Sequence, residues 1–552
     1  VQTLHSVTHP NDNAALLRPQ IRSLTLSTLT ALFLLFATNH TFWAKAAANY
    51  ANQPFAFASL IIGLSGAFVA ACVTPSVKYL TKPVFILLVL AAASASWFMD
   101  SYGVIIDVNM IRNAAETNTA EAGHLVTAGF VLHMALYGIL PAAMIAWVRI
   151  EHDGFPRKFV RNIAAIVAGL GLFALAGISF AGTHASLTRE HRDMFATLNP
   201  FVPIGKVVDY VIASNTERNL VAAPLGTDAR LVGTPTNRRK PRLTIIVTGE
   251  TARAENFSLA GYGRTTNPEL QARDIFYFKN ATSCGTATAT SVPCMFSNLT
   301  REGYSHSKAL ATENLLDVLS HAGVHVEWWD NNTGSKNVAN RIKEVTLSNH
   351  TDKRFCADGE CQDGVLLNGL DAWLDGVSQD TVLVLHQMGS HGPAYYLRYP
   401  EAFRQFTPEC QTAEFSECSR EQIVNSYDNT ILFTDHVIAT IIDKLKAREE
   451  KFSPSLFYAS DHGESLGEYG LYLHGAPYML APSQQTHVPM LVWFGSEQKA
   501  EMNLDCLRKE TEGPASHDNL FHTTLGMMQV DTAVRDPALD LASACRTPVA
   551  TQ

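Results

Sequence analysis

Long runs of lysine and arginine are missing from this sequence of 552 residues, and its formal net charge at pH 7 is −9. Because proteins that bind nucleic acid carry clustered positive charge, no nucleic-acid partner is expected. Internal repeats and low-complexity segments are also missing. A chain of this length is too long for a single compact core, so at least two folded domains are expected.

Charge itself is scarce between residues 24 and 182, whereas residues 240–552 have the composition of an ordinary soluble domain. A helix crosses a bilayer with about 20 apolar residues. Segments that meet this requirement lie at 24–43, 56–77, 84–100, 125–148 and 159–181, and the third is the shortest. We therefore expect a transmembrane domain of five helices (1–182), a bridging linker with short helices (183–240) and a second domain (241–552).

Basic residues are scarce in the loops on one side of these segments. If the N-terminus is cytoplasmic, the outer loops hold only Lys45 and Arg112. The cytoplasmic loops then hold Arg18, Arg22, Lys78, Lys82, Arg149, Arg157, Lys158 and Arg161. Positive charge marks the cytoplasmic side, and an odd number of crossings exports the C-terminal half.

Cysteine is absent before Cys284 except at Cys72, and no C-x2-C pair of the kind that binds zinc occurs. The remaining cysteines fall in pairs: Cys284 and Cys294, Cys356 and Cys361, Cys410 and Cys418, and Cys506 and Cys545. This pattern favours disulfides and an oxidising compartment over a zinc cluster, although the bonding of the last pair stays open. Cysteines and loop charges therefore agree in placing the second domain outside the inner membrane.

The second domain alternates short β-branched runs with helical stretches. Strands are expected at 243–248, 324–328, 381–385, 456–459 and 489–494, with a long helix at 423–446. Continuous apolar runs of this length are typical of buried strands in a mostly parallel sheet, so an α/β/α fold is expected. Polar residues follow the strands, at Glu250, His386, His391, Asp461 and His462. Such side chains meet at one edge of an open α/β sheet, where ligands bind.

A carboxylate and an imidazole lie next to each other in Asp461–His462–Gly463–Glu464. Zinc accepts this mixed set of oxygen and nitrogen donors, and Glu250 offers a third ligand from another strand end. Each of these residues alone is more often structural than catalytic. Their common placement at strand ends favours a metal site.

A threonine-rich segment, SCGTATATSVPC, offers Thr286, Thr288 and Thr290 as nucleophiles before an apolar helical stretch. A threonine hydroxyl reacts when a metal or a base removes its proton, and a helix N-terminus favours an incoming phosphate. A capping stretch is the alternative, and spacing does not select the reactive threonine. Phosphate could also be bound by Lys336, His386, His391 and His474, which lie beside or near glycines.

Polar residues also recur in the loop between the third and fourth crossings. Asn113, Thr117 and Glu121 are spaced i, i+4 and i+8, which would place them on one face of a short helix. A solvated surface helix explains the same pattern equally well.

These motifs resemble those of the phosphoethanolamine transferases that modify lipid A, a group that includes the mobile colistin-resistance enzymes. The resemblance covers nearly the whole chain through VTGETARAENFSLAGYGR, SCGTATATSVPCMF, DNNTGSK, LHQMGSHGPAYY, SDHGESLGE and LHGAP. SCGTATATSVPCMF together with LHQMGSHGP is highly specific, whereas DHGE alone would be weak. The family belongs to the alkaline phosphatase/sulfatase-like superfamily, and that fold is implied for the second domain.

The resemblance implies roles for individual residues. It makes Thr288 the nucleophile, and Glu250, Thr288, Asp461 and His462 the ligands of one tightly held zinc ion. It associates Lys336, His386, His391, Glu464 and His474 with substrate binding, proton transfer or a second, weaker zinc site. It assigns the phosphoethanolamine head group to Asn113, Thr117 and Glu121.

The same resemblance implies a donor, an acceptor and a location. Phosphatidylethanolamine would lose diacylglycerol, and phosphoethanolamine would pass through a covalent threonine intermediate to lipid A, conferring polymyxin resistance. The protein would be a multi-pass monomer of the bacterial inner membrane, in contact with membrane lipids, with its catalytic domain in the periplasm.

Three alternatives remain. A phosphoglycerol or phosphoethanolamine transferase for another envelope glycan would have the same catalytic residues. A sulfatase-like hydrolase would need a C/S-x-P-x-R nucleophile context, which TATATSVPC lacks. A non-catalytic envelope sensor would not need residues at every metal and nucleophile position.

Overall fold

The computed structural model describes residues 18–117, 119–151, 153–232, 240–348, 351–357 and 359–547. The chain forms two compact units. The helical unit comprises residues 1–106 and 128–206, and the α/β unit comprises residues 107–127 and 207–552. The segment 107–127, which lies between two apolar segments in the sequence, therefore belongs to the α/β unit.

The helical unit is built almost entirely from helices. They are α1 (Ser23–Ala37), α2 (His40–Asn49), α3 (Pro54–Val73), α4 (Thr81–Tyr102), α7 (Ala128–His133), the π-helical η2 (Met134–Ile139), α8 (Leu140–Trp147), α9 (Phe155–Ser179), α10 (Ala181–Glu190) and α11 (Arg192–Ala196). One short parallel strand pair, β1 (Gln20–Arg22) with β2 (Arg149–Glu151), joins the regions before α1 and after α8.

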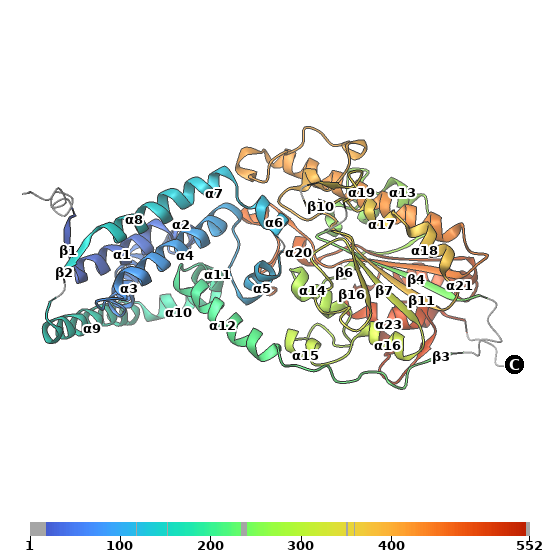
Figure 1. The fold of residues 1–552 in the computed structure, drawn as a ribbon, viewed down its shortest axis with the longest axis horizontal. Helices are drawn as coiled ribbons and strands as arrows, with labels where there is room; N and C mark the ends of the chain where they lie inside the picture. The colour runs from blue at the N-terminus through green and yellow to red at the C-terminus, as the bar shows by residue number, and fades with distance from the viewer. Residues whose placement is uncertain are drawn as a thin grey trace, which may run out of the picture. The chain divides into compact units, whose positions relative to one another are not determined.

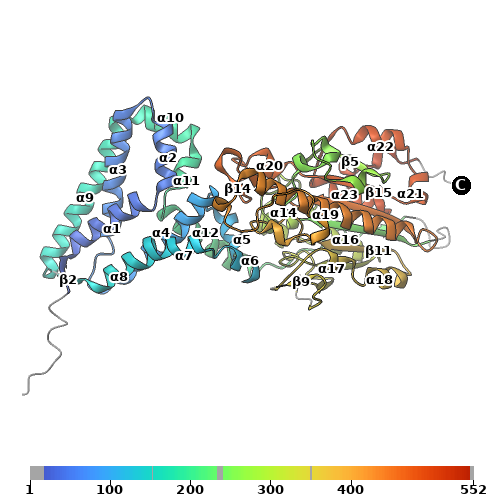
Figure 2. The same ribbon diagram turned by 90° about the horizontal axis from the view of Figure 1, so that it is seen from above.

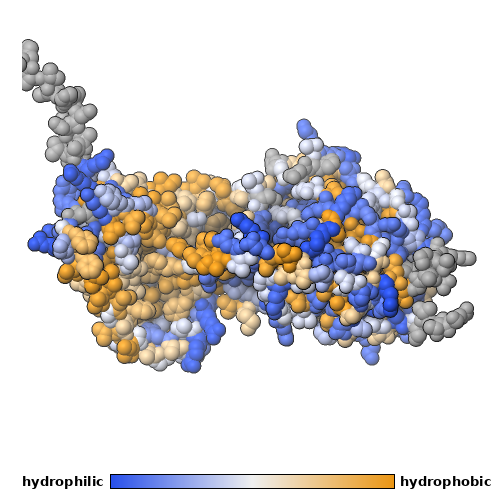
Figure 3. Space-filling view, turned by 60° about the horizontal axis from the view of Figure 1, so that its bottom comes forward, coloured by the Kyte–Doolittle hydropathy of each residue, from blue (hydrophilic) through white to orange (hydrophobic). Residues whose placement is uncertain are grey.

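Among the described residues, four helical segments are long and apolar enough to cross a membrane: α3, α4, the continuous run Ala128–Trp147, and α9. Their surfaces expose large apolar side chains such as Leu87, Leu132, Phe159 and Leu175. Figure 3 shows this surface as broad orange areas, whereas the α/β unit is mostly blue and white. The expected fifth segment is present as the shorter apolar helix α1.

The first predicted crossing is wrong at its C-terminal end. The helix ends at Ala37, and α2 begins at His40. The side chains of Thr38 and Asn39 each donate a hydrogen bond of 2.8 Å to the carbonyl of Leu34. These side chains replace backbone donors of a continuing helix, which is why polar residues of this kind favour helix ends.

Helices α3 and α9 pack closely along their length and lie side by side in Figures 1 and 2. The contact is closest at Gly66 and Gly169. A Cβ atom on either glycine would lie 2.5 Å from the carbonyl oxygen of the other. Small residues allow this approach, which supplies the van der Waals contact that holds membrane helices together.

The α/β unit is organised around a seven-stranded sheet with the order β5-β15-β12-β4-β11-β7-β8. The strands are β4 (Arg242–Gly249), β5 (Phe276–Phe278), β7 (His325–Asp330), β8 (Lys343–Thr346), β11 (Thr381–His386), β12 (Ser453–Ser460) and β15 (Met490–Phe494). All neighbours are parallel except at β15, which runs antiparallel to β12 and β5. The mostly parallel sheet confirms the prediction, and β5 and β8 are the strands that it missed.

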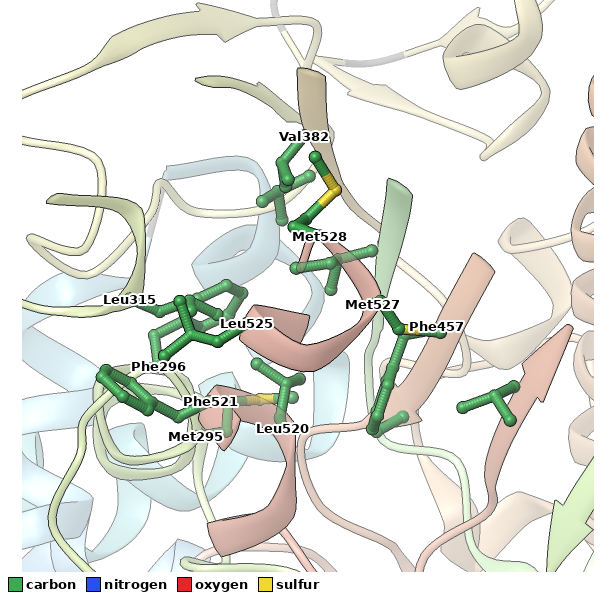
Figure 4. Close-up of a cluster of buried hydrophobic side chains, with 14 of the residues drawn as sticks. Met295, Phe296, Leu315, Val382, Phe457, Leu520, Phe521, Leu525, Met527 and Met528 are labelled. Carbon is green, nitrogen blue, oxygen red and sulfur yellow. The ribbon is translucent and has the colours of Figure 1, made fainter. Parts of the chain in front are cut away.

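Helices cover both faces of the sheet (Figure 1). One layer contains α13 (Pro268–Gln271), α17 (Gly364–Leu367) and α19 (Arg420–Lys446), and the other contains α14 (Thr288–Met295), α16 (Leu315–His321) and α23 (Asp518–Met527). Strands β4 and β12 are buried along their whole length, as expected for strands covered on both faces. Figure 4 shows how Phe296, Leu315 and Phe521 gather with Val382 and Phe457 in the core beneath the second layer.

The remaining elements are short or peripheral. The helices are α5 (Val108–Glu116), α6 (Thr119–His124), α12 (Phe201–Glu217), α15 (His306–Leu310), α18 (Leu370–Gly376), α20 (Ser483–Thr486), α21 (Ser496–Ala500) and α22 (Leu504–Glu510). The minor strand pairs are β3 (Arg230–Leu231) with β17 (Val530–Asp531), β6 (Asn280–Thr282) with β16 (Pro514–Ser516), β9 (Cys356–Ala357) with β10 (Glu360–Cys361), and β13 (Ser465–Leu466) with β14 (Tyr472–Leu473).

Local sequence signals explain where the longest helix begins. Helix α19 starts directly after Ser419, whose side chain accepts a hydrogen bond from the backbone N–H of Gln422. The Gln422 side chain in turn accepts a hydrogen bond from the backbone N–H of Ser419. This capping box satisfies two backbone donors and places the start of the helix three residues before the predicted one.

Four disulfides are formed, Cys284–Cys294, Cys356–Cys361, Cys410–Cys418 and Cys506–Cys545. The first three bonds are those expected from the sequence, and the Cys506–Cys545 bond answers the question that the sequence left open. Cys72 is free and buried.

The contact between α3 and α9 predicts a large difference between two glycines of the same helix. Gly169→Leu should lower the apparent Tm of the full chain in detergent, because overpacking a close contact costs about 1–3 kcal/mol. Gly171→Leu is the matched control, since a Cβ there meets nothing within 4 Å. Equal Tm values for both variants would contradict the packing described for these helices.

Candidate active site

The site lies where the central strands of the sheet end. Glu250 follows β4, Asp461 follows β12, and His386 is the last residue of β11. Ser460 pairs with Gly249 in the parallel register, and the Asp461 N–H donates a 2.9 Å hydrogen bond to the Gly249 carbonyl. The register therefore brings these side chains out of neighbouring strands at the same edge.

Glu250, Asp461 and His462 form a group whose donor atoms all lie within 4.8 Å of one another. His462 Nε2 lies 3.4 Å from Glu250 Oε1 and 3.4 Å from Asp461 Oδ2. All three side chains are buried. Two carboxylates and one imidazole converging on a point are a donor set that zinc accepts.

The electrostatics of this group fit a bound cation. Burial and the adjacent Glu250 carboxylate raise the pKa of Asp461 well above its usual range. Burial also acts to raise the pKa of Glu250, but the imidazoles of His462, His391 and His474 lower it to about 2. Asp461 Oδ2 is buried without a hydrogen-bond partner among the described residues. A divalent cation would supply that partner and allow both carboxylates to be ionised.

Thr288, the first residue of α14, points into this group. Its Oγ1 lies 3.0 Å from Glu250 Oε2 and 3.4 Å from His462 Nε2. Thr286 instead donates a 2.6 Å hydrogen bond to the carbonyl of Ala476. Of these two threonines, Thr288 is therefore the one whose hydroxyl lies beside the possible metal ligands.

A disulfide and a backbone hydrogen bond anchor the segment around Thr288. The Cys284–Cys294 disulfide joins the residues before α14 to its last turn. The N–H of Gly475 donates a 2.7 Å hydrogen bond to the Thr286 carbonyl, which ties the loop of His474 to this segment. The first backbone N–H groups of a helix have no partner within it and favour an anion such as phosphate.

A row of imidazoles leads away from the cluster of possible metal ligands. The ring of His474 lies 4.3 Å from that of His462 and 5.4 Å from that of His391, between ring centroids. His391 Nε2 then lies 3.0 Å from Glu121 Oε1. Glu464 accepts a 2.6 Å hydrogen bond from Tyr395 Oη at one oxygen and contacts His474 Nδ1 at 2.9 Å with the other.

Neighbouring charges set different protonation states along this row. Burial alone would lower the pKa of His391, but the Glu121 carboxylate raises it to about 9, so His391 is a cation at neutral pH. Burial and the charges of His462 and His391 lower the pKa of His474 well below its usual range. Burial raises the pKa of Glu464 to about 8. The row therefore combines a cationic imidazole, which is suited to binding an anion such as phosphate, with groups whose pKa values suit proton transfer.

Lys336 and His386, two further predicted site residues, each contact a carboxylate. Lys336 Nζ lies 3.6 Å from Glu116 Oε2 and donates a 3.1 Å hydrogen bond to the Thr333 carbonyl. Lys336 also lines a polar cavity of about 400 Å³. His386 Nδ1 lies 2.8 Å from Asp330 Oδ2, with both side chains fully buried. His386 thus contacts a carboxylate that the sequence did not single out.

The prediction that Asn113, Thr117 and Glu121 share one helix face is wrong. Helix α5 ends at Glu116, and Thr117 has an extended backbone with φ −68° and ψ 140°. The Thr117 hydroxyl donates a 2.8 Å hydrogen bond to the Asn113 carbonyl, the acceptor that a continuing helix would have given to the Thr117 N–H. Glu121 reaches the site from the separate helix α6, and the hydrogen bond found for Asn113 and Thr117 joins them to each other.

Several polar partners of the site were not identified from the sequence. Asn332 Nδ2 donates a 2.9 Å hydrogen bond to Glu250 Oε2, and the Thr251 hydroxyl donates to Glu250 Oε1. Asp330 contacts His386, and Tyr395 donates to Glu464. All of these residues lie within or beside the motifs VTGETAR, WWDNNTGSK and LHQMGSHGPAYY. The motifs therefore indicated the region of the site, whereas the type of each residue alone did not indicate its role.

Residues 242–530 match the Sulfatase family, and residues 64–214 match the family described as phosphoethanolamine transferase EptA/EptB. The chain is 41% identical to phosphoethanolamine transferase EptA of Escherichia coli K12 over 478 residues, which cover 85% of this chain and 87% of that protein. It is 36% identical to phosphatidylethanolamine transferase Mcr-1 of Escherichia coli over 529 residues, which cover 93% of this chain and 96% of that protein.

The structure is similar to that of the integral membrane protein lipooligosaccharide phosphoethanolamine transferase A from Neisseria meningitidis. The TM-score is 0.92 at 33% sequence identity, over 96% of this chain and all of that chain (100%). The soluble domain of the same enzyme matches the C-terminal part of the chain at 42% identity with a TM-score of 0.58, over 60% of this chain and 100% of that domain.

These similarities confirm the predicted fold class and a multi-pass inner-membrane protein with a periplasmic α/β domain. They cover both units of the structure, so the relationship is not confined to a shared catalytic domain. The chain therefore belongs to the phosphoethanolamine transferase family of EptA and Mcr-1.

Proposed function

We propose that the protein transfers phosphoethanolamine from phosphatidylethanolamine to lipid A through a covalent intermediate on Thr288. The observation that carries this proposal is the position of Thr288 Oγ1, 3.0 Å from Glu250 Oε2 and 3.4 Å from His462 Nε2 in a buried group of potential metal ligands. The names of relatives support the substrates. Mcr-1 is named for phosphatidylethanolamine, and a 28% identical Escherichia coli relative is a Kdo(2)-lipid A phosphoethanolamine transferase.

Glu250, Asp461, His462 and Thr288 are the residues that would hold one tightly bound zinc ion, and a second, weaker site stays open. When bound, zinc would supply a Lewis acid that lowers the pKa of the threonine hydroxyl and balances the two carboxylates. The chain itself orients the hydroxyl, because Glu250 Oε2 accepts its hydrogen bond and α14 fixes its backbone.

In the first step, Thr288 Oγ1 forms a bond to phosphorus while the bond from phosphorus to the diacylglycerol oxygen breaks. The hydroxyl proton leaves toward Glu250 Oε2, which already accepts it in a hydrogen bond. The departing diacylglycerol oxygen takes a proton from the group formed by His391, His474 and Glu464. The products are diacylglycerol and phosphoethanolamine bound to the threonine.

In the second step, an oxygen of lipid A attacks the same phosphorus and the bond to Thr288 Oγ1 breaks. Thr288 Oγ1 takes back the proton from Glu250 Oε2, and the attacking oxygen gives its proton to the group formed by His391, His474 and Glu464, so every group returns to its starting state. Donor and acceptor therefore use one site in turn, as in a ping-pong mechanism with a covalent intermediate. Because the added amine is cationic, the modified surface attracts polycationic polymyxins less strongly.

His391 and Glu121 are suited to the two ends of the phosphoethanolamine group. The cationic imidazole of His391 would bind a phosphate oxygen, and the carboxylate of Glu121 would bind the ammonium group. In the structure these two side chains contact each other at 3.0 Å, so each compensates the charge of the other before substrate arrives.

Replacing the nucleophile should abolish the first step. Thr288→Ala should lower the release of diacylglycerol from phosphatidylethanolamine by at least about 10³-fold, because it removes the oxygen on which the proposed intermediate forms. Thr290→Ala, on the same helix but partly exposed, should keep nearly normal turnover and serves as the matched control. Full turnover by the Thr288 variant would refute the assignment of the nucleophile.

Metal content should depend on the buried carboxylates. Asp461→Ala should reduce the zinc retained by the purified full chain, measured by mass spectrometry of the metal, because it removes one of the converging donors. Asp505→Ala changes a side chain that is 94% exposed and should retain normal zinc. Chelation of the wild-type chain should stop turnover and added zinc should restore it; unchanged turnover after complete metal removal would contradict a metal site here.

Expression of the gene tests the acceptor. The lipid A of expressing cells should gain the mass of phosphoethanolamine, and the cells should survive higher polymyxin concentrations than cells with Thr288→Ala. Unmodified lipid A together with a modified glucan or core sugar would favour transfer to another envelope glycan. Free phosphoethanolamine without any modified acceptor would favour hydrolysis.

A further inference from the structure

The Cys356–Cys361 disulfide closes a short loop, CADGEC, beside the site. Its two ends pair as β9 and β10. Glu360 in β10 is only 8% exposed, although a carboxylate in so small a loop could easily face solvent. Burying a carboxylate costs free energy unless positively charged groups compensate it. The partners of Glu360 therefore show which parts of the chain the loop contacts through this side chain.

Glu360 joins two elements that are distant in the sequence. Its Oε2 lies 2.8 Å from His124 Nε2 at the end of α6. The same carboxylate accepts hydrogen bonds of 2.8 and 3.4 Å from the Arg398 guanidinium. Although burial raises the pKa of Glu360, these two partners lower it to about 2. Glu360 is therefore ionised at neutral pH and binds both elements.

Arg398 contacts both Glu360 and the backbone of His391 in the imidazole row. It is 4% exposed, and its Nε donates a 2.9 Å hydrogen bond to the carbonyl of His391. Asp363, on the other side of Cys361, accepts hydrogen bonds of 2.8 and 2.9 Å from the N–H groups of Met388 and Gly389. Residues on both sides of Cys361 thus hold the two ends of the segment that leads to His391.

Helix α6 connects the contact at Glu360 with the contact at His391. His124 and Glu121 lie three residues apart on this helix, a spacing that places side chains on one face. His124 contacts Glu360, and Glu121 contacts His391 at 3.0 Å. The contacts therefore run from Glu360 through Arg398 to His391, on to Glu121, and back through α6 to His124.

We propose that Glu360 is a positioning residue that fixes His391 and Glu121 relative to each other, through Arg398 on one side and His124 on the other. The disulfide loop then has a catalytic purpose beyond stability, because it presents this carboxylate. The inference rests on the proposed function only in that His391 and Glu121 bind the phosphoethanolamine group.

The test uses conservative variants of the full chain, because truncating Glu360 would leave a cavity and would remove every acceptor that Glu360 offers to Arg398. Glu360→Gln keeps the shape and removes the charge. Arg398→Lys keeps the charge and removes the planar fork that reaches both Glu360 and the His391 carbonyl. Each should lower diacylglycerol release about tenfold, as expected when a reacting group is displaced slightly. Glu401→Gln, which removes an 82% exposed partner of Arg404, should leave turnover unchanged.

A double-mutant cycle separates positioning from general damage. Glu360→Gln should lower turnover about tenfold in the wild-type background but less than about twofold when His391→Ala is already present. Equal losses in both backgrounds would overturn the proposal, as would normal turnover of Glu360→Gln. Thermal unfolding and zinc content of each variant show that the fold and the cluster of possible metal ligands remain intact.

The loop itself provides an independent second variant. Cys356→Ser combined with Cys361→Ser should reproduce the loss seen with Glu360→Gln, and adding Glu360→Gln to it should cost little more. Normal turnover without the disulfide would overturn the role given to the loop. Failure of the proposed function would be visible separately, as normal turnover of Thr288→Ala or of His391→Ala while the Glu360 variants are still compared with wild type.

Discussion

The site depends on compensating the repulsion between two buried carboxylates that lie close together. Glu250 and Asp461 follow adjacent parallel strands, and their oxygens lie within 4.8 Å together with His462. At an effective dielectric constant of about 20, two like charges about 4 Å apart repel each other by about 4 kcal/mol. A divalent cation converts this repulsion into attraction. The same cation would then act on the Thr288 hydroxyl, whose oxygen already lies 3.0 Å from Glu250.

The order of the chain explains how a membrane protein completes this site. Residues 107–127 lie between α4 and α7 of the helical unit in the sequence, but they belong to the α/β unit. Glu121 of this segment contacts His391, with 3.0 Å between Glu121 Oε1 and His391 Nε2. The residue that we propose for the lipid head group thus comes from a segment that has apolar helices before and after it in the sequence. A lipid donor gives a physical reason for this arrangement.

Much of the fold could be predicted because the relevant signals are local. Strands β4 and β12 are continuous apolar runs buried on both faces, and Ser419 with Gln422 marks the start of α19. The missed strands lack such signals. Strand β8 is the polar, partly exposed sequence KEVT at the edge of the sheet, and β5 has only three residues. The apolar helix α1 ends before the predicted residue because the side chains of Thr38 and Asn39 bind the Leu34 carbonyl, which hydrophobicity alone does not reveal.

The site was predictable as a set of residue types at strand ends, but its contacts were not. Choosing Thr288 over Thr286 requires the direction of each hydroxyl, which depends on α14 and on the loop of His474. Asn332 binds Glu250 across 82 positions of sequence. Thr117 looked helical by spacing, yet its side chain replaces its own backbone N–H at the Asn113 carbonyl. The spacing of residue types in the sequence predicts neither hydrogen bonds between distant segments nor a side chain that takes the place of its own backbone N–H.

Anomalous X-ray scattering at the zinc absorption edge, from crystals of the full chain, shows whether a metal ion lies at the ends of β4 and β12. We expect a zinc peak about 2 Å from Glu250, Asp461 and His462 and from the Thr288 hydroxyl oxygen. Crystals of an active preparation that show no anomalous peak at the ends of β4 and β12, or a peak coordinated by other residues, would contradict it.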